Sequence, residues 1–102
     1  MNDPKKPSLE TSSTPQKILV VEDEPDIAAL VAYQLTRNGF RVKTALDGLE
    51  ALKIVDREIP DLIILDRMLP GISGDEVLSS LKNEPETSEI PVLVLTAKKE
   101  QK

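Results

Sequence analysis

Three short aliphatic runs constrain the fold of this chain more than any other feature of its sequence. Ile18–Val21, Leu62–Leu65 and Val92–Leu95 are continuously apolar, rich in β-branched residues, and bounded by acidic, polar or proline residues. This pattern is typical of strands that are buried on both faces of a parallel sheet. A fourth segment, Arg41–Ala45, alternates polar with apolar residues, which indicates a strand at the edge of a sheet.

Segments with helical periodicity separate the predicted strands. The first begins with Pro25 at a first helical position and is expected to end at Asn38–Gly39. The second follows Asp47, and the third begins near Ser73, which has the spacing of a capping box with Glu76. The apolar residues at helical spacing are Ile27, Leu30, Val31 and Leu35 in the first helix, Leu49, Leu52 and Val55 (expected to face inward) in the second, and Val77, Leu78 and Leu81 (also inward) in the third.

This order of elements predicts an α/β fold. Strands that alternate with helices form a doubly wound parallel sheet with right-handed crossovers and helices on both faces. The chain of 102 residues has room for one such domain, which we place at 17–102. Residues 1–16 contain three prolines and almost nothing apolar, so we expect a disordered lead-in there.

Composition excludes several classes of function. The chain has no cysteine and no histidine, so it lacks thiolate and imidazole metal ligands and any triad built on histidine. Its formal net charge of -5 argues against direct binding to nucleic acid. The longest apolar runs are about four residues, against roughly 20 for a membrane helix, and the start lacks the apolar core of a signal peptide. We therefore expect a cytoplasmic protein without membrane or nucleic-acid contacts.

The carboxyl ends of the predicted strands carry the candidate chemistry, because ligand sites of open doubly wound sheets lie there. The first strand is followed by Glu22, Asp23 and Glu24, the third ends in Asp66, and the fourth in Thr96. If the first and third strands are neighbours at about 4.8 Å, Asp23 and Asp66 share one small pocket. Like charges so close raise each other's pKa or recruit a cation, and Mg²⁺ prefers oxygen ligands.

Each of these residues also has an ordinary interpretation. Acidic residues after a strand are often loop residues or helix-start anions, and Thr96 alone would be a common strand-end hydroxyl. The convergence of three strand ends with suitable chemistry favours a site. Met68 is expected to contribute at most its backbone carbonyl, and Gly71 and Gly74 are expected to be turn residues.

Three segments resemble a known family. KILVVEDEPDI, LIILDRMLPGISGDEV and IPVLVLTAK are similar to the receiver domain of two-component response regulators, and most nearly to the subfamily that often carries a winged-helix DNA-binding domain downstream. The resemblance covers residues 17–102. It implies a flavodoxin-like sheet with strand order 2-1-3-4 in chain numbering, with the polar second strand at one edge.

The resemblance also implies roles for individual residues. Asp66 would be the phosphoacceptor and Thr96 the switch hydroxyl. Mg²⁺ would be held by Asp23 directly, by Glu22 through water, by Asp66, and by the Met68 backbone carbonyl. The donor would be a phosphohistidine on a sensor histidine kinase or phosphotransfer protein, and an output domain would lie downstream. Such a chain is not an enzyme in the ordinary sense, because it assists only its own phosphorylation and dephosphorylation. The physical demands of phosphoryl transfer, in-line positioning and charge compensation, agree with this set of groups.

The family pattern continues further than this sequence does. Members carry another helix, a fifth strand with a lysine followed by proline, and a last helix, whereas this sequence stops at Lys102. We therefore expect a truncated receiver with an uncovered fourth strand and a partly open apolar face on the first helix. Lys98, Lys99 and Lys102 are expected to be a solvated charge run and not a substitute for the family's lysine.

Other functions fit less well. A metal-dependent phosphatase with an aspartate nucleophile usually needs a second acid two residues later, where this chain has Met68. A flavin or dinucleotide site needs glycines or hydroxyls in the first loop, where the acids would repel phosphate. A receiver-like interaction module that does not switch, or an inactive truncated fragment, remains the open alternative.

Overall fold

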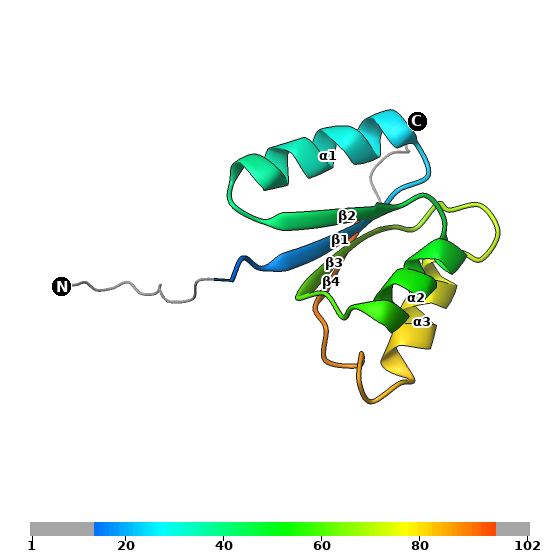
Figure 1. Cartoon of the computed structure of the whole chain (residues 1–102). Helices are drawn as coiled ribbons and strands as arrows, with labels where there is room; N and C mark the ends of the chain where they lie inside the picture. Colours follow the sequence, from blue (N-terminus) through cyan, green and yellow to red (C-terminus); the bar gives the residue numbers. More distant parts are fainter. Residues whose placement is uncertain (1–13, 96–102) are drawn as a thin grey trace.

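The computed structural model describes residues 14–95, which form a four-stranded parallel sheet flanked by three helices (Figure 1). The predicted α/β fold and strand order are confirmed, because the sheet runs β2-β1-β3-β4 with all pairs parallel. The elements are β1 (Lys17–Val21), α1 (Pro25–Arg37), β2 (Arg41–Ala45), α2 (Gly48–Arg57), β3 (Leu62–Asp66), α3 (Gly74–Lys82) and β4 (Val92–Leu95).

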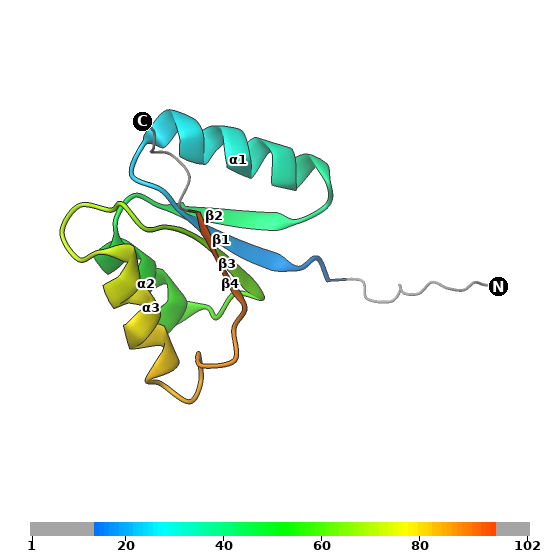
Figure 2. The ribbon, with the colours of Figure 1, turned by 180° about the vertical axis from the view of Figure 1, so that it is seen from behind.

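The helices lie in two layers. Figures 1 and 2 show α1 on one face of the sheet and α2 with α3 on the other. The central strands read as continuous aliphatic runs because their side chains alternate between these two layers. Leu19 and Ile63 belong to the cluster under α2 and α3, whereas Ile18 and Ile64 pack on the side of Val31 and Leu35 from α1.

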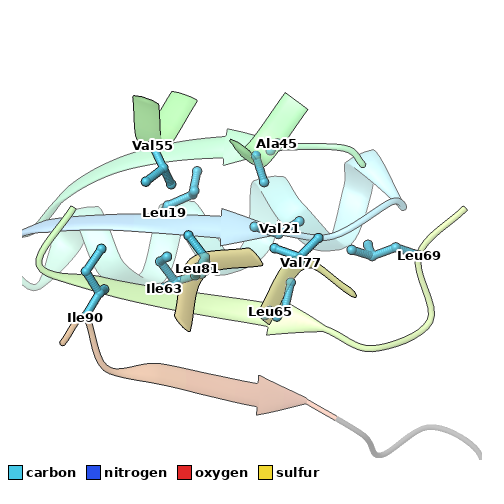
Figure 3. Close-up of a cluster of buried hydrophobic side chains, with 11 residues drawn as sticks. Leu19, Val21, Ala45, Val55, Ile63, Leu65, Leu69, Val77, Leu81 and Ile90 are labelled. Atoms are coloured by element: carbon cyan, nitrogen blue, oxygen red, sulfur yellow. The ribbon is translucent and has the colours of Figure 1, made fainter. Parts of the chain in front are cut away.

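The larger cluster is the main hydrophobic core (Figure 3). It combines strand residues with the inner faces of α2 and α3, and seven of its members are 1% exposed or less. Its buried members are Leu19, Val21, Ala45, Ala51, Val55, Ile63, Leu65, Leu69, Val77, Leu81 and Ile90. Burial of aliphatic area on this side, at about 25 cal/mol per Å², is the main force that holds the helices to the sheet.

The helix ends follow the signals in the sequence. Asp47 caps α2 by accepting a hydrogen bond from the Glu50 N–H at 2.8 Å. The capping box of Ser73 and Glu76 is formed in both directions at the start of α3. After α1, Gly39 has a φ of +94°, a conformation that glycine adopts without the strain of a Cβ.

Two predictions about single positions were wrong. Leu49 was expected to face inward, but it is 59% exposed. The other two residues expected on that face do contact the core, since Val55 is buried and Leu52 packs against it, and α2 also buries Gly48 and Ala51. A Cβ at Gly48 would lie 2.6 Å from side-chain atoms of Ile72 and of Val77, so the small residue sets which face of α2 approaches the core. Gly74, expected in a turn, is the first residue of α3.

Other expectations fall on the remaining parts of the chain. The lead-in at 1–16 lies mostly outside the described residues, and the described chain enters β1 at Lys17. Thr96, Lys98, Lys99 and Lys102 also lie outside the described residues. Gly71, with a φ of +72°, is a turn residue as expected.

Candidate functional site

Parallel register brings the acids after β1 and at the end of β3 to the same edge of the sheet. Val21 pairs with Leu65, so Glu22 and Asp66 each follow that pair by one residue. Glu22, Asp23 and Asp66 each offer one carboxylate oxygen, and these oxygens all lie within 4.8 Å of one another. The structure thus brings Asp23 and Asp66 into one cluster, as predicted, with Glu22 beside them. Thr96, at the third strand end of the predicted site, lies outside the described residues.

The three acids differ in exposure. Glu22 and Asp66 are 6% and 2% exposed, whereas Asp23 is exposed. The cluster therefore has two carboxylates on its protein side and one on its solvent side. A small ion or a phosphodonor would approach from the side of Asp23.

Asp66 is held in one orientation by its own loop. Its Oδ1 accepts a hydrogen bond from the Met68 backbone N–H at 3.0 Å. Within residues 14–95, no hydrogen bond reaches the other carboxylate oxygen, Oδ2, which makes it the available nucleophile or ligand atom. Asp66, the last residue of β3, thus has one oxygen tied by a hydrogen bond and one that accepts none from residues 14–95.

Glu22 lies in an environment that disfavours its charge. Burial raises the pKa of the Glu22 carboxyl above its usual value, the negative charge of Asp66 adds to this, and a hydrogen bond from the Glu24 backbone N–H at 3.2 Å opposes it. No lysine or arginine of the described part of the chain forms an ion pair with the cluster. Three hard oxygen ligands without a basic partner there fit a small divalent cation such as Mg²⁺.

Three further residues considered in the sequence analysis, Met68, Thr96 and Glu24, are not members of the three-acid cluster. The Met68 side chain is 67% exposed, and the residue meets Asp66 through its N–H, so a role of its carbonyl as a metal ligand stays a prediction. Thr96, the predicted switch hydroxyl, lies outside the described residues. Glu24 occupies the N-cap of α1 without a side-chain capping bond and is not in the three-acid cluster.

Two contacts beside Asp66 could not be anticipated from the pattern of apolar residues. Arg67 forms an ion pair with Asp75 of α3, Nη2 to Oδ2 at 3.1 Å. Gly74 packs directly on the backbone at the end of β3. The only signal in the sequence is a glycine at a first helical position directly after a good N-cap, where a residue with a side chain is usually better.

A cavity of about 390 Å³ lies at the opposite end of the sheet, near the first residues of β1 and β2. Its lining includes Lys17, Lys43 and Glu58. These charges are largely satisfied by one another, since Glu58 pairs with Lys17 at 3.2 Å and with Lys43 at 3.9 Å. The three-acid cluster is therefore the better candidate for chemistry.

Comparison with known proteins identifies the family. The model of the response regulator receiver domain matches residues 18–102. The chain belongs to this family, whose members are signalling domains. Within residues 14–95, no helix is long and apolar enough to cross a membrane.

Two relatives of high sequence identity are transcriptional regulators by name. The chain is 47% identical over 85 residues to the phosphate regulon transcriptional regulatory protein PhoB of Rhizobium meliloti. It is 50% identical over 86 residues to the alkaline phosphatase synthesis transcriptional regulatory protein PhoP of Bacillus subtilis. The matches cover 83% and 84% of this chain but 37% and 35% of those proteins, so the chain spans little more than a third of their length.

A solved structure confirms the flavodoxin-like fold. The Mn²⁺-bound form of the response regulator Rcp1 matches with a TM-score of 0.75 and 33% identity, over 85% of this chain and 69% of that one. The expected resemblance to receiver domains is thus confirmed by sequence and by fold, and the similarity to PhoB and PhoP is one of sequence.

Proposed function

We propose that this receiver domain accepts a phosphoryl group on Asp66 in a Mg²⁺-dependent reaction. The main support is the position of Asp66, which is buried at the end of a central strand in one cluster with Glu22 and Asp23. One of its carboxylate oxygens accepts a hydrogen bond from the Met68 N–H. The donor is a phosphohistidine of a sensor histidine kinase or phosphotransfer protein. Receiver family membership and similarity to two transcriptional regulators support this assignment.

The reaction is a phosphoryl transfer between two nucleophiles. Oδ2 of Asp66 attacks the phosphorus atom, the P–N bond to the donor imidazole breaks, and an acyl phosphate forms on Asp66. The bond from Met68 N–H keeps Oδ1 out of the way and orients the attacking oxygen. Asp23 directly, Glu22 through water, Asp66 and the Met68 carbonyl would hold Mg²⁺, which supplies charge compensation for the transferred group. Thr96 then bonds the phosphoryl group as the switch hydroxyl.

The wider assignments belong to the same proposal. Residues 17–102 form the receiver, and 1–16 form a lead-in that takes no part in the reaction. A downstream output domain reads the phosphorylated state, as the names of the two regulators suggest. The chain works in the cytoplasm, turns over only its own acyl phosphate, and contacts neither membrane nor nucleic acid itself.

A labelling experiment tests the proposal. The protein is incubated with acetyl phosphate and Mg²⁺, and a mass gain that hydroxylamine removes is expected. Asp66→Asn should abolish the gain, whereas Asp56→Asn, a change at an exposed position of α2, should not. Equal labelling of the Asp66→Asn variant would refute the assignment. A lack of labelling in the wild type would favour the alternative of a receiver that does not switch.

A further inference from the structure

The first residue of α3 lies against the backbone of the proposed phosphoacceptor. A Cβ placed on Gly74 would be 2.6 Å from the carbonyl oxygen of Asp66, 2.7 Å from the Cα of Arg67 and 3.3 Å from its carbonyl carbon. All three atoms belong to the backbone, so none can rotate away as the end of a flexible side chain can. Any other residue at this position therefore requires that α3 or the end of β3 moves.

The need for glycine here is steric and not conformational. Gly71, in the same loop, has a φ of +72° and open space around its missing Cβ, whereas Gly74 does not have a positive φ. In a helix, glycine is less favourable than alanine, so the choice of glycine at Gly74 opposes local helix stability. The close approach to Asp66 is the feature that accounts for it.

Two further contacts close the base of the loop between β3 and α3. The Gly74 N–H donates to the Arg67 carbonyl at 3.2 Å, and the Arg67 guanidinium pairs with Asp75 at 3.1 Å. Met68 lies inside this closed loop, and its N–H holds Oδ1 of Asp66. The position of Met68 therefore depends on how closely α3 approaches Arg67.

A side chain at position 74 would displace the loop more easily than the strand. β3 is paired on both sides, with β1 and with β4, and the Arg67 N–H continues this pairing by donating to the Leu95 carbonyl at 3.3 Å. The first residue of α3 is not part of a strand pair and is joined to the end of β3 by the bond from its own N–H to the Arg67 carbonyl. The bond from Met68 N–H to Asp66 is thus the contact that would lengthen.

We infer that Gly74 is a positioning residue for Asp66, because its missing side chain lets α3 close the loop that aims the Met68 N–H at Oδ1. The inference rests on the proposed function of Asp66. We therefore expect that substitution of Gly74 slows the phosphorylation of Asp66 by more than the loss of folding stability alone explains.

The test compares Gly74→Ala with Gly71→Ala in the 102-residue chain. Helix propensity alone predicts that Gly74→Ala raises the melting temperature, whereas the steric contact predicts a decrease. Gly71→Ala also lowers the melting temperature, because alanine is strained at positive φ, and so provides a destabilised control in the same loop.

Two readouts separate positioning from stability. In ¹⁵N-resolved NMR spectra without metal, Gly74→Ala should move the Met68 amide proton toward the position of a weaker hydrogen bond, and Gly71→Ala should not. With acetyl phosphate and Mg²⁺, Gly74→Ala should label Asp66 at least about tenfold more slowly than Gly71→Ala, since small displacements of a reacting group are costly.

Each outcome decides the inference. An unchanged Met68 resonance, or a labelling rate equal to that of Gly71→Ala, would overturn it. If the wild type is not labelled at all, the proposed function fails, and the Met68 resonance alone judges the role of Gly74. If Gly74→Ala does not fold, Asp75→Ala, which breaks the ion pair at the loop base without adding atoms, should shift the same resonance in the same direction. No shift there would also overturn the inference.

Discussion

At the scale of single residues, the site depends on one exposed acid in front of two buried ones. Asp23 is exposed, whereas Glu22 and Asp66 are buried. A metal ion that reaches the cluster meets the Asp23 carboxylate without any need to desolvate it fully. The neighbouring Glu24 is also exposed, but it lies outside the cluster, which makes it a matched control.

Asp23→Asn should weaken Mg²⁺ binding by about tenfold or more, because it removes a charged oxygen ligand from a site with few of them. Glu24→Gln removes the same charge one residue further along the chain and should leave the affinity nearly unchanged. A titration with Mg²⁺ that follows backbone amide shifts measures both. Equal weakening by the two changes would show that general electrostatics, and not ligation by Asp23, determines binding.

Glu22→Gln should stabilise the metal-free protein near neutral pH. The folded-state pKa of Glu22 is raised, so its contribution to the free energy of unfolding is favourable below the usual value of 4.5 and is lost as pH rises through the raised pKa. Glutamine does not ionise, so the variant does not lose this stability as pH rises. Urea unfolding of both proteins at pH 4 and pH 7 without metal checks the sign, and the advantage of the variant should shrink toward pH 4. A greater advantage at pH 4 would contradict the assigned cause.

The acids could be predicted because they follow strands, whereas the contacts that orient them could not. Glu22, Asp23 and Asp66 converge because parallel strands end at a common edge, and this follows from the order of runs in the sequence. The bond from Met68 N–H and the approach of Gly74 depend on the path of a loop. No periodicity of side chains encodes that path.

At the scale of elements, helix orientation was the weakest part of the sequence prediction. All seven described elements occur where the runs and caps placed them, but one of the three residues expected to face inward from α2 does not. Val55 is buried and Leu52 packs against the core, whereas Leu49 is exposed. Leu49 has the hydrophobicity of a core residue but is 59% exposed, whereas its neighbour Gly48 lies close to Ile72 and Val77. Packing of a small residue outweighs the simple count of apolar positions there.

Leu81→Ala should lower the free energy of unfolding by about 3 kcal/mol, because Leu81 is 3% exposed in the main core. Leu49→Ala, a chemically identical change at a position that is 59% exposed, should change it by less than about 0.5 kcal/mol. Urea denaturation monitored by circular dichroism measures both values. Similar losses would show that the Leu49 side chain is buried against the core, as the sequence had predicted.

At the scale of the whole molecule, the two sheet edges differ in character. β2 carries Arg41 and Lys43, charges that discourage pairing with another chain. β4 contains four aliphatic residues, of which Leu93 is 54% and Leu95 37% exposed. On the same side of the sheet, α1 leaves Ile27 and Leu30 exposed, as expected from the sequence. Each 100 Å² of such apolar area that stays open forgoes about 2.5 kcal/mol.

The 102-residue chain in isolation should therefore be marginally stable or self-associate through β4. Leu93→Lys places a charge on that edge and should reduce the association measured by sedimentation at micromolar concentrations. Leu49→Lys adds the same charge to an exposed position of α2 and should have no such effect. Association that persists equally in both variants would locate the contact elsewhere.

Because β1 and β3 pair in a fixed register, the site depends on the number of residues in each strand more than on which aliphatic residues these are. Ile63 and Ile64 face opposite layers of helices. Asp66 lies two residues after Ile64 and therefore faces the same layer as Ile64. Exchange of one aliphatic residue for another in β3 keeps that spacing. Deletion of a single residue would shift Asp66 by about 3.3 Å and turn its carboxylate toward the opposite layer, although the strand would be as hydrophobic as before. Genetic variation in these strands should thus accept many substitutions and reject every insertion or deletion of one codon.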